Sequence, residues 1–175
     1  MTIQLRPYAL ADFEKLHEID QACYEPRIAY SRTEMRRYLR FPGADCVVAE
    51  ATPQEKRAEV AESGGDAPTL IGFCITAHRG PWGYIITMDV LAAYRRSGVG
   101  SMLLAESEKR MAARGVRQIG LETATNNFAA IAFWQKHGYG KSGVRKNYYP
   151  GGRDAYSMAK RLASHEMTAK AGPHR

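Results

Sequence analysis

Cysteine is scarce in this chain, and its arrangement excludes several common classes of protein. The 175 residues include three cysteines, Cys23, Cys46 and Cys74, and no two of them have the Cys-x-x-Cys spacing of a zinc or redox motif. The five histidines also form no pair at metal-ligand spacing. We therefore predict no metal site, and we expect the three thiols to be reduced and to pack as small apolar groups.

Long apolar runs are missing too. No stretch of the sequence approaches the roughly 18 apolar residues that a membrane-spanning helix needs. Residues 1–6 alternate as a strand does and do not form a charged leader followed by an apolar segment. These observations predict a cytoplasmic protein without a membrane partner. The length and the hydrophobic fraction of 45% suit one folded domain over residues 1–162.

Acidic residues are fewer than basic ones, which gives the chain a net charge of +7. Such a balance is compatible with binding nucleic acid or a small anionic ligand. The lysines and arginines are spread along the chain without a run of five, so we do not expect a nucleic-acid partner. Two segments are polar and lack an apolar period. Residues 52–69 are interpreted as a mobile insertion between two strands, and residues 163–175 as a loose basic tail.

The most informative segment is a strand, a turn and a helix. Residues 83–90 are β-branched and aromatic, which is typical of a buried strand, and the residues after Gly100 have helical periodicity. Gly98 and Gly100 have no Cβ, so the N–H groups at the start of the helix can approach an anion closely. The helix dipole favours phosphate at this end, and Arg95 and Arg96 add positive charge. We call this turn the phosphate cradle, which comprises Arg95, Arg96, Ser97, Gly98, Val99, Gly100 and Ser101.

The phosphate cradle fits neither of two common nucleotide-binding motifs. It lacks the third glycine of the dinucleotide fingerprint and the Gly-Lys-Ser/Thr of a P-loop. Taken alone, the phosphate cradle is as compatible with a plain strand-to-helix turn as with a phosphate site. Its Arg-x-x-Gly-x-Gly pattern over residues 95–100 resembles the acetyl-CoA pyrophosphate loop of the GNAT acetyltransferase superfamily.

A second segment, residues 121–139, resembles the fifth strand and the following helix of the same superfamily. Asn127 and Ala130 form its Asn-x-x-Ala motif, and the resemblance implies that the pantetheine arm of CoA passes them. Asn127 suits a helix N-cap equally well, and both roles are open for it. Residues 145–158 resemble the last hairpin of the RimI-like branch, which comprises protein N-terminal acetyltransferases.

The resemblance implies an α/β (α+β) fold of the GNAT type. Its central sheet is mixed, mostly antiparallel and twisted, splays between strands four and five, and is flanked by about four helices. Local patterns predict helices that begin after Asp12, Ser31, Gly98 and Asn127, with Asp12 as a cap and a capping box from Ser31 to Glu34. They predict strands at residues 3–6, 46–49, 70–75, 83–90 and 116–122, and a final hairpin of residues 139–147 and 155–162.

The resemblance also implies where acetyl transfer takes place. The backbone of Met88 and Val90 lies against the pantetheine and the thioester, and the Val90 N–H is the candidate oxyanion donor. Glu122 aligns with the general base of RimI-like enzymes. Its alternative role is that of a strand-end carboxylate bonded to a nearby backbone group.

Trp134 stands where RimI-like enzymes carry a tyrosine that acts as the general acid. An indole N–H donates a hydrogen bond but delivers no proton at neutral pH. We therefore expect Trp134 to contribute shape beside the cofactor. Either the thiolate leaves without an acid, or Tyr139, Tyr148 or Tyr149 supplies the proton.

Four tyrosines are the candidate residues for binding the acceptor substrate. Tyr24 and Tyr30 lie in an aromatic-rich loop, and Tyr148 and Tyr149 lie near Pro150-Gly151-Gly152. By resemblance they line the acceptor groove and grip the first residues of a peptide. Packing against the core is the alternative role for all four.

The pKa of the acceptor amine separates the possible reactions. At pH 7 the neutral form costs about 1.4 kcal/mol for an α-amino group and about 4.6 kcal/mol for a lysine. A single carboxylate therefore suits an α-amine. We predict acetyl-CoA-dependent N-acetylation of a protein or peptide N-terminus, without a metal. The alternatives are N-acetylation of a small-molecule amine or a lysine, and a non-catalytic module that binds acyl-CoA or nucleic acid. The oligomeric state is not predicted.

Overall fold

The structure, a computed structural model, describes residues 1–52 and 68–162. Its strands form one sheet in the spatial order β1-β2-β3-β4-β5-β7-β6. The strands are β1 (Thr2–Pro7), β2 (Asp45–Thr52), β3 (Thr69–Arg79), β4 (Trp82–Val90), β5 (Gln118–Ala124), β6 (Gly140–Tyr149) and β7 (Arg153–Arg161). The α-helices of the described ranges are α1 (Phe13–Cys23), α2 (Arg32–Leu39), α3 (Val99–Ala113) and α4 (Phe128–Lys136). The expected insertion, apart from its ends, and the expected tail lie outside the described residues.

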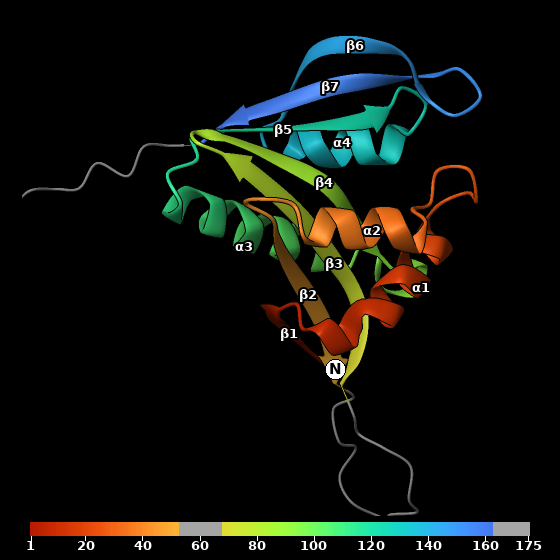
Figure 1. Ribbon diagram of the computed structural model, residues 1–175, viewed down its shortest axis with the longest axis vertical. Helices are drawn as coiled ribbons and strands as arrows, with labels where there is room; N and C mark the ends of the chain where they lie inside the picture. The colour runs from red at the N-terminus through yellow and green to blue at the C-terminus, as the bar shows by residue number, and fades with distance from the viewer. Residues whose placement is uncertain (53–67, 163–175) are drawn as a thin grey trace, which may run out of the picture.

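The sheet opens between β4 and β5. All other neighbouring strands are antiparallel, whereas β4 and β5 are parallel and pair only where residues 82–84 meet residues 118–120. Both strands continue beyond this pairing, and Figure 1 shows them diverging from their shared end. The structure therefore confirms the expected mixed, mostly antiparallel sheet that splays between strands four and five and is flanked by four helices.

An irregularity in β4 accompanies this opening. Thr87 pairs with Ile75 and Ile85 pairs with Thr76, so Ile86 is an extra residue in β4. Such a β-bulge bends its strand and increases its twist. It lies just beyond the last pairing with β5, and we infer that it turns β4 away from β5.

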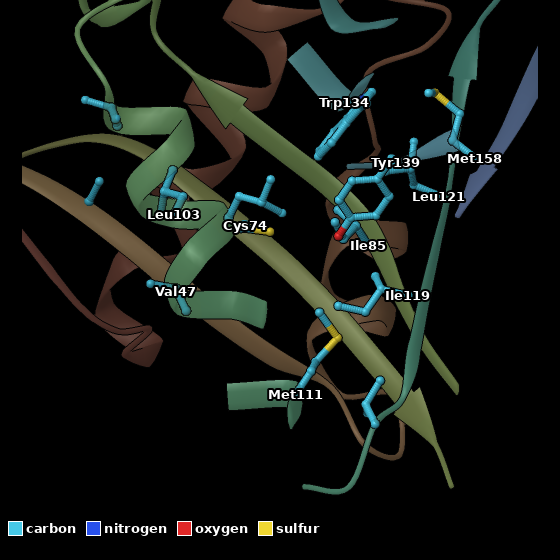
Figure 2. Packing of buried hydrophobic residues seen from close by; sticks show 14 of the residues in the cluster. Val47, Cys74, Ile85, Leu103, Met111, Ile119, Leu121, Trp134, Tyr139 and Met158 are labelled. Atoms are coloured by element: carbon cyan, nitrogen blue, oxygen red, sulfur yellow. The ribbon is translucent and has the colours of Figure 1, made fainter. Parts of the chain in front are cut away.

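Helices cover both faces of the sheet. The cluster on one face includes Leu103, Leu104 and Met111 of α3 and Trp134 of α4, and the cluster on the other includes residues of α1 and α2. Figure 2 shows how the first cluster packs its side chains together. Because both faces are covered, nearly every residue of β3 is buried. None of the helices in the described ranges is both long and apolar enough to cross a membrane.

Local signals predicted most helix ends correctly. Ser31 accepts a hydrogen bond from the Glu34 N–H, and Glu34 accepts one from the Ser31 N–H, as expected of a capping box. Gly115 and Gly138 follow their helices with φ values of +83° and +88°, in the left-handed region that favours glycine. The fifth strand begins at Gln118, two residues later than predicted.

Asp12 has the predicted position but not the predicted contact. It is the N-cap residue of α1, but its carboxylate makes no capping bond to that helix. Instead it accepts two hydrogen bonds from the Arg6 guanidinium, at 2.7 and 2.8 Å, and one from the Ala9 N–H at 2.7 Å. The charged guanidinium of a neighbouring strand competes successfully with the neutral N–H groups of the helix.

Candidate active site

The phosphate cradle begins α3. Gly98 has a φ of +93° and is the N-cap residue of that helix. The hydrogen bond from the Met102 N–H to the Gly98 carbonyl, at 3.0 Å, begins the helical ladder. The N–H groups of Val99, Gly100 and Ser101 precede that bond and have no acceptor within the helix. A cluster of N–H groups is thus available at the positive end of a helix of 15 residues.

Two side chains of the phosphate cradle bind the turn itself. Arg95 donates from Nε to the carbonyl of Val90 at 2.9 Å, and the Ser97 hydroxyl donates to the carbonyl of Tyr94 at 2.6 Å. Arg96 is exposed and has a φ of +63°, which is uncommon for a residue other than glycine. In this geometry Arg95 and Ser97 hold the shape of the turn, and the Arg96 side chain takes no part in these bonds.

Ser101 is tied to the end of α4. Its hydroxyl lies 2.9 Å from Nε2 of His137, and Nδ1 of the same ring lies 2.8 Å from the Phe133 carbonyl. A carbonyl only accepts, so Nδ1 donates to it, and Nε2 makes the bond with the Ser101 hydroxyl. Ser101 was predicted to belong to the phosphate cradle, but its partner His137 was not predicted.

Asn127 caps α4 while keeping a donor available. Its Oδ1 accepts a hydrogen bond from the Ala130 N–H at 3.1 Å, which is the expected capping role. The two N–H donors of its amide are not used in this bond. Capping and a ligand role are therefore compatible at this residue.

The end of β4 directs its backbone into the opening. The carbonyl of Val90 accepts from Arg95 and, at 3.5 Å, from the Cys23 thiol, so it does not pair with β3. The N–H and C=O of a strand residue point toward the same edge. We infer that the Val90 N–H also faces away from β3, toward the space that β5 has left. Met88 lies two residues earlier and presents its backbone to the same edge.

Glu122 is a buried carboxylate at the open end of β5. Its side chain is 8% exposed. Oε1 accepts from the Ser157 hydroxyl at 3.3 Å and lies 3.4 Å from Nε of Arg145. Oε2 is buried and has no hydrogen-bond partner in the described part of the chain. The partners of Glu122 are thus side chains, not the backbone group that its alternative role required.

The candidate general acids differ in how accessible they are. Tyr139 is buried in the core and donates its hydroxyl to Glu108 at 2.9 Å, and burial raises its pKa far above the usual value. It is thereby removed as a candidate. Burial also raises the pKa of Tyr148, and that of Tyr149 to about 12. Trp134 is 7% exposed and packs edge-on against Tyr139, with ring centroids 5.5 Å apart.

Tyr24, one of the predicted acceptor tyrosines, lies near a buried acid that was not predicted from the sequence. The Tyr24 hydroxyl lies 3.4 Å from Oγ1 of Thr87, which donates to Oδ1 of Asp89 at 3.0 Å. Asp89 is 2% exposed, and its Oδ2 has no hydrogen-bond partner among the described residues. Burial, followed by the nearby charge of Asp20, raises the pKa of Asp89 to about 7. An acid within a strand that is otherwise mostly apolar was the available signal.

Two loops meet beside these residues. Tyr30 donates its hydroxyl to the carbonyl of Ile86, the bulged residue of β4, at 3.3 Å. Glu25, in the same loop, lies 3.7 Å from Arg153 at the start of β7. Tyr148 and Tyr149 end β6 and form an edge-on pair with centroids 4.9 Å apart. Two of the four predicted acceptor tyrosines therefore come from the loop between α1 and α2, and the other two come from the end of β6.

Comparisons with known proteins agree with this architecture. The chain is 40% identical over 81 residues to the N-alpha-acetyltransferase of Saccharolobus solfataricus, covering 46% of this chain and 48% of the relative. It thus spans about half the length of the curated relatives it matches.

Solved structures have the same fold. The ribosomal-protein-S18-alanine N-acetyltransferase from Escherichia coli superposes with a TM-score of 0.75 at 22% identity, covering 95% of this chain and 99% of that one. A chain of the NatC complex bound to Gag peptide and CoA gives 0.72 at 23% identity, covering 93% and 100%. The profile of the acetyltransferase (GNAT) family matches residues 13–139, more than half of the sequence. The phosphate cradle, the splayed sheet and this match together show that the chain belongs to the GNAT family of acetyltransferases.

Proposed function

We propose that the protein transfers the acetyl group of acetyl-CoA to the α-amino group of a protein or peptide N-terminus. The observation that carries this proposal is Glu122, a buried carboxylate at the opening of the sheet with one unpartnered oxygen. The names of the relatives support it, since they describe acetylation of N-α-amino groups and of the alanine of a ribosomal protein. The NatC structure, which holds a peptide and CoA, also supports it.

Acetyl-CoA fits the residues that are present. The unpaired N–H groups at the start of α3 and the exposed Arg96 suit its phosphates. Met88 and Val90 present backbone groups to the opening, where the pantetheine arm can pair with β4 as β5 no longer does. Asn127 and Ala130 lie at the start of α4, and Asn127 keeps amide donors for the same arm.

Glu122 prepares the acceptor. Its carboxylate takes a proton from the incoming ammonium group, directly or through a water, which leaves a neutral amine. For an α-amine with a pKa of about 8, this step costs about 1.4 kcal/mol at pH 7. The side chains of Ser157 and Arg145 hold Oε1, so Oε2 is the oxygen that accepts the proton.

The backbone of Val90 stabilises the transfer. As the amine nitrogen bonds to the acetyl carbon, the Val90 N–H donates a hydrogen bond to the thioester oxygen, on which negative charge develops. The carbon–sulfur bond then breaks and CoA leaves as a thiolate. A thiol with a pKa of about 8.5 is a good leaving group, so no side chain needs to protonate it before it departs. The nitrogen gives its second proton to water as the amide forms, and water protonates the sulfur.

A peptide panel tests this function. Peptides with a free N-terminus and no lysine should be acetylated once, and the release of CoA should match the amount of modified peptide. The same peptides with a blocked N-terminus, with or without an internal lysine, should not react. Acetylation confined to lysine side chains or to small amines would contradict the proposal.

A further inference from the structure

A second concave surface lies on the sheet face that carries Glu122. It is a groove of about 380 Å³, which we call the distal groove, and its lining includes Phe41, Ala77, Trp82, Tyr84, Gln118 and Gly120. Trp82 is 61% exposed and Phe41 is 54% exposed. Two large aromatic side chains are thus left open to solvent at one groove, which is the pattern of a binding site.

The distal groove and the candidate acetyl-transfer site share strand β5. Alternate residues of a strand share a face, so Gln118 and Gly120 lie on the same face of β5 as Glu122. Ile119 and Leu121 point to the opposite face and pack in the core with α3. Gly120 has no side chain to separate the groove from Glu122.

The residues between the distal groove and Glu122 are flanked by β7 and by the α2 region. On β7, the small residues Ser157 and Ala159 pair with Glu122 and Gly120, and Arg161 pairs with Gln118 at the groove itself. On the other side, the ring of Tyr38 in α2 lies 4.9 Å from that of Tyr30, and Phe41 follows soon after that helix ends. The path therefore runs from the acceptor tyrosines to Phe41 and Trp82.

The length of the path fits an extended polypeptide. Gln118 and Glu122 are four strand residues apart, a distance of about 13 Å, which is also the length of about four residues of an extended acceptor chain. We propose that the distal groove binds an apolar side chain at position four or five of the acceptor polypeptide. This inference rests on the proposed function, because Glu122 sets the position of the acceptor's first residue.

A second copy of the chain fits the distal groove less well. Nine residues line it, whereas a stable protein interface involves about 20–30 residues from each partner. A single extended segment needs no more than such a groove, and its side chain gains the apolar contact of both exposed rings.

Acceptor peptides of two lengths test the inference by kinetics. One peptide has three residues, and two others have eight residues that begin with the same three and carry either leucine or serine at position five. We expect the leucine peptide to have the lowest KM. Trp82→Ala and Phe41→Ala should each raise that KM by up to about tenfold, which corresponds to about 1.4 kcal/mol of apolar contact. Both variants should leave kcat and the KM of the short peptide unchanged. Leu10→Ala, which removes another exposed apolar side chain, is the matched control and should change nothing.

Tryptophan fluorescence provides a readout that does not depend on catalysis. The two tryptophans are Trp82, which is exposed, and Trp134, which is buried, so a ligand in the distal groove should shift the emission of Trp82 to shorter wavelength. The probe is the leucine peptide with an acetylated N-terminus, and Trp82→Phe should abolish the shift. A saturable emission shift without any peptide acetylation would contradict the proposed function but would still support peptide binding in the distal groove. Normal acetylation with the same KM for all three peptides and no emission shift would overturn the inference about the distal groove and leave the proposed function intact. A concentration-dependent dimer that Trp82→Ala disrupts would also overturn it, by assigning the groove to a second copy.

Discussion

At Glu122, two side chains share one carboxylate oxygen and the other oxygen has no partner in the described residues. A buried polar atom without a partner costs free energy, so its presence calls for an explanation. The two contacts fix the orientation of the carboxylate, and both are made by side chains and not by the backbone group of the alternative role.

Replacing Glu122 tests its role as the general base. Because a positioned base contributes about 10²- to 10⁴-fold, Glu122→Gln should lower kcat/KM for a peptide N-terminus by a factor in that range at pH 7. The loss should shrink toward pH 8 and above, where the α-amine arrives neutral. A pH–rate profile of both proteins checks this. Glu106→Gln, on the surface of α3, is the control. A small deficit that does not change with pH would return Glu122 to a structural role.

Asp89 should make the stability of the fold depend on pH. Its pKa in the folded protein, about 7, lies above the ordinary value of 3.8, so the folded state binds the proton more tightly than the unfolded state. The stabilising contribution of Asp89 to the free energy of unfolding is therefore full below about pH 3.8, the ordinary pKa. It is lost as the pH rises to about 7.

Asp89→Asn removes this dependence. The variant should be more stable relative to the wild type at pH 8 than at pH 5, by on the order of 2 kcal/mol. Urea denaturation at the two pH values measures the difference. Asp20, whose pKa burial raises to about 6, is present in both proteins, so its own titration largely cancels. An identical stability change at both pH values would mean that Asp89 does not titrate as described.

At the scale of elements, local patterns predicted where the helices and strands lie, because period and turn chemistry are properties of adjacent residues. They failed at Asp12, whose partner Arg6 belongs to the preceding strand. They also missed the bond between Ser101 and His137, since its members lie 36 residues apart and meet only when α3 and α4 pack. Glu122 was predicted from its resemblance to the general base of RimI-like enzymes, but its partners Ser157 and Arg145, which belong to the final hairpin, were not predicted.

The bond between Ser101 and His137 leads to a prediction about the phosphate cradle. If the Ser101 hydroxyl acts by bonding to His137, then Ser101→Ala and His137→Phe should each weaken acetyl-CoA binding by about two- to tenfold. The double variant should be no weaker than either single one, because both remove the same bond. Calorimetric titration of the wild type, the two single variants and the double variant with acetyl-CoA measures these affinities. Additive losses would indicate instead that Ser101 contacts the phosphates directly.

For the whole molecule, the decisive feature is that two parts of one sheet meet over three residue pairs. Strands β1 to β4 and strands β5 to β7 are joined through residues 82–84 and 118–120, and beyond these the backbone edges of β4 and β5 face the opening. Unpaired strand edges favour addition of another extended chain. A pantetheine arm in the opening would form hydrogen bonds with both parts of the sheet. It would thereby restrict the motion of one part relative to the other.

Acetyl-CoA should therefore stabilise the whole chain against heat. A ligand at 100 times its Kd adds about 2.7 kcal/mol of stability, which for a domain of this size raises Tm by roughly 5 to 10 °C. Gly98→Glu places a negative charge in the phosphate cradle and should abolish the shift. Gly98→Asn is the matched control, because asparagine tolerates a positive φ and adds no charge, so it should retain most of the shift. Differential scanning fluorimetry with and without acetyl-CoA measures all three proteins. An equal rise in Tm for Gly98→Glu would show that acetyl-CoA binds elsewhere, since a carboxylate at the start of α3 repels its phosphates.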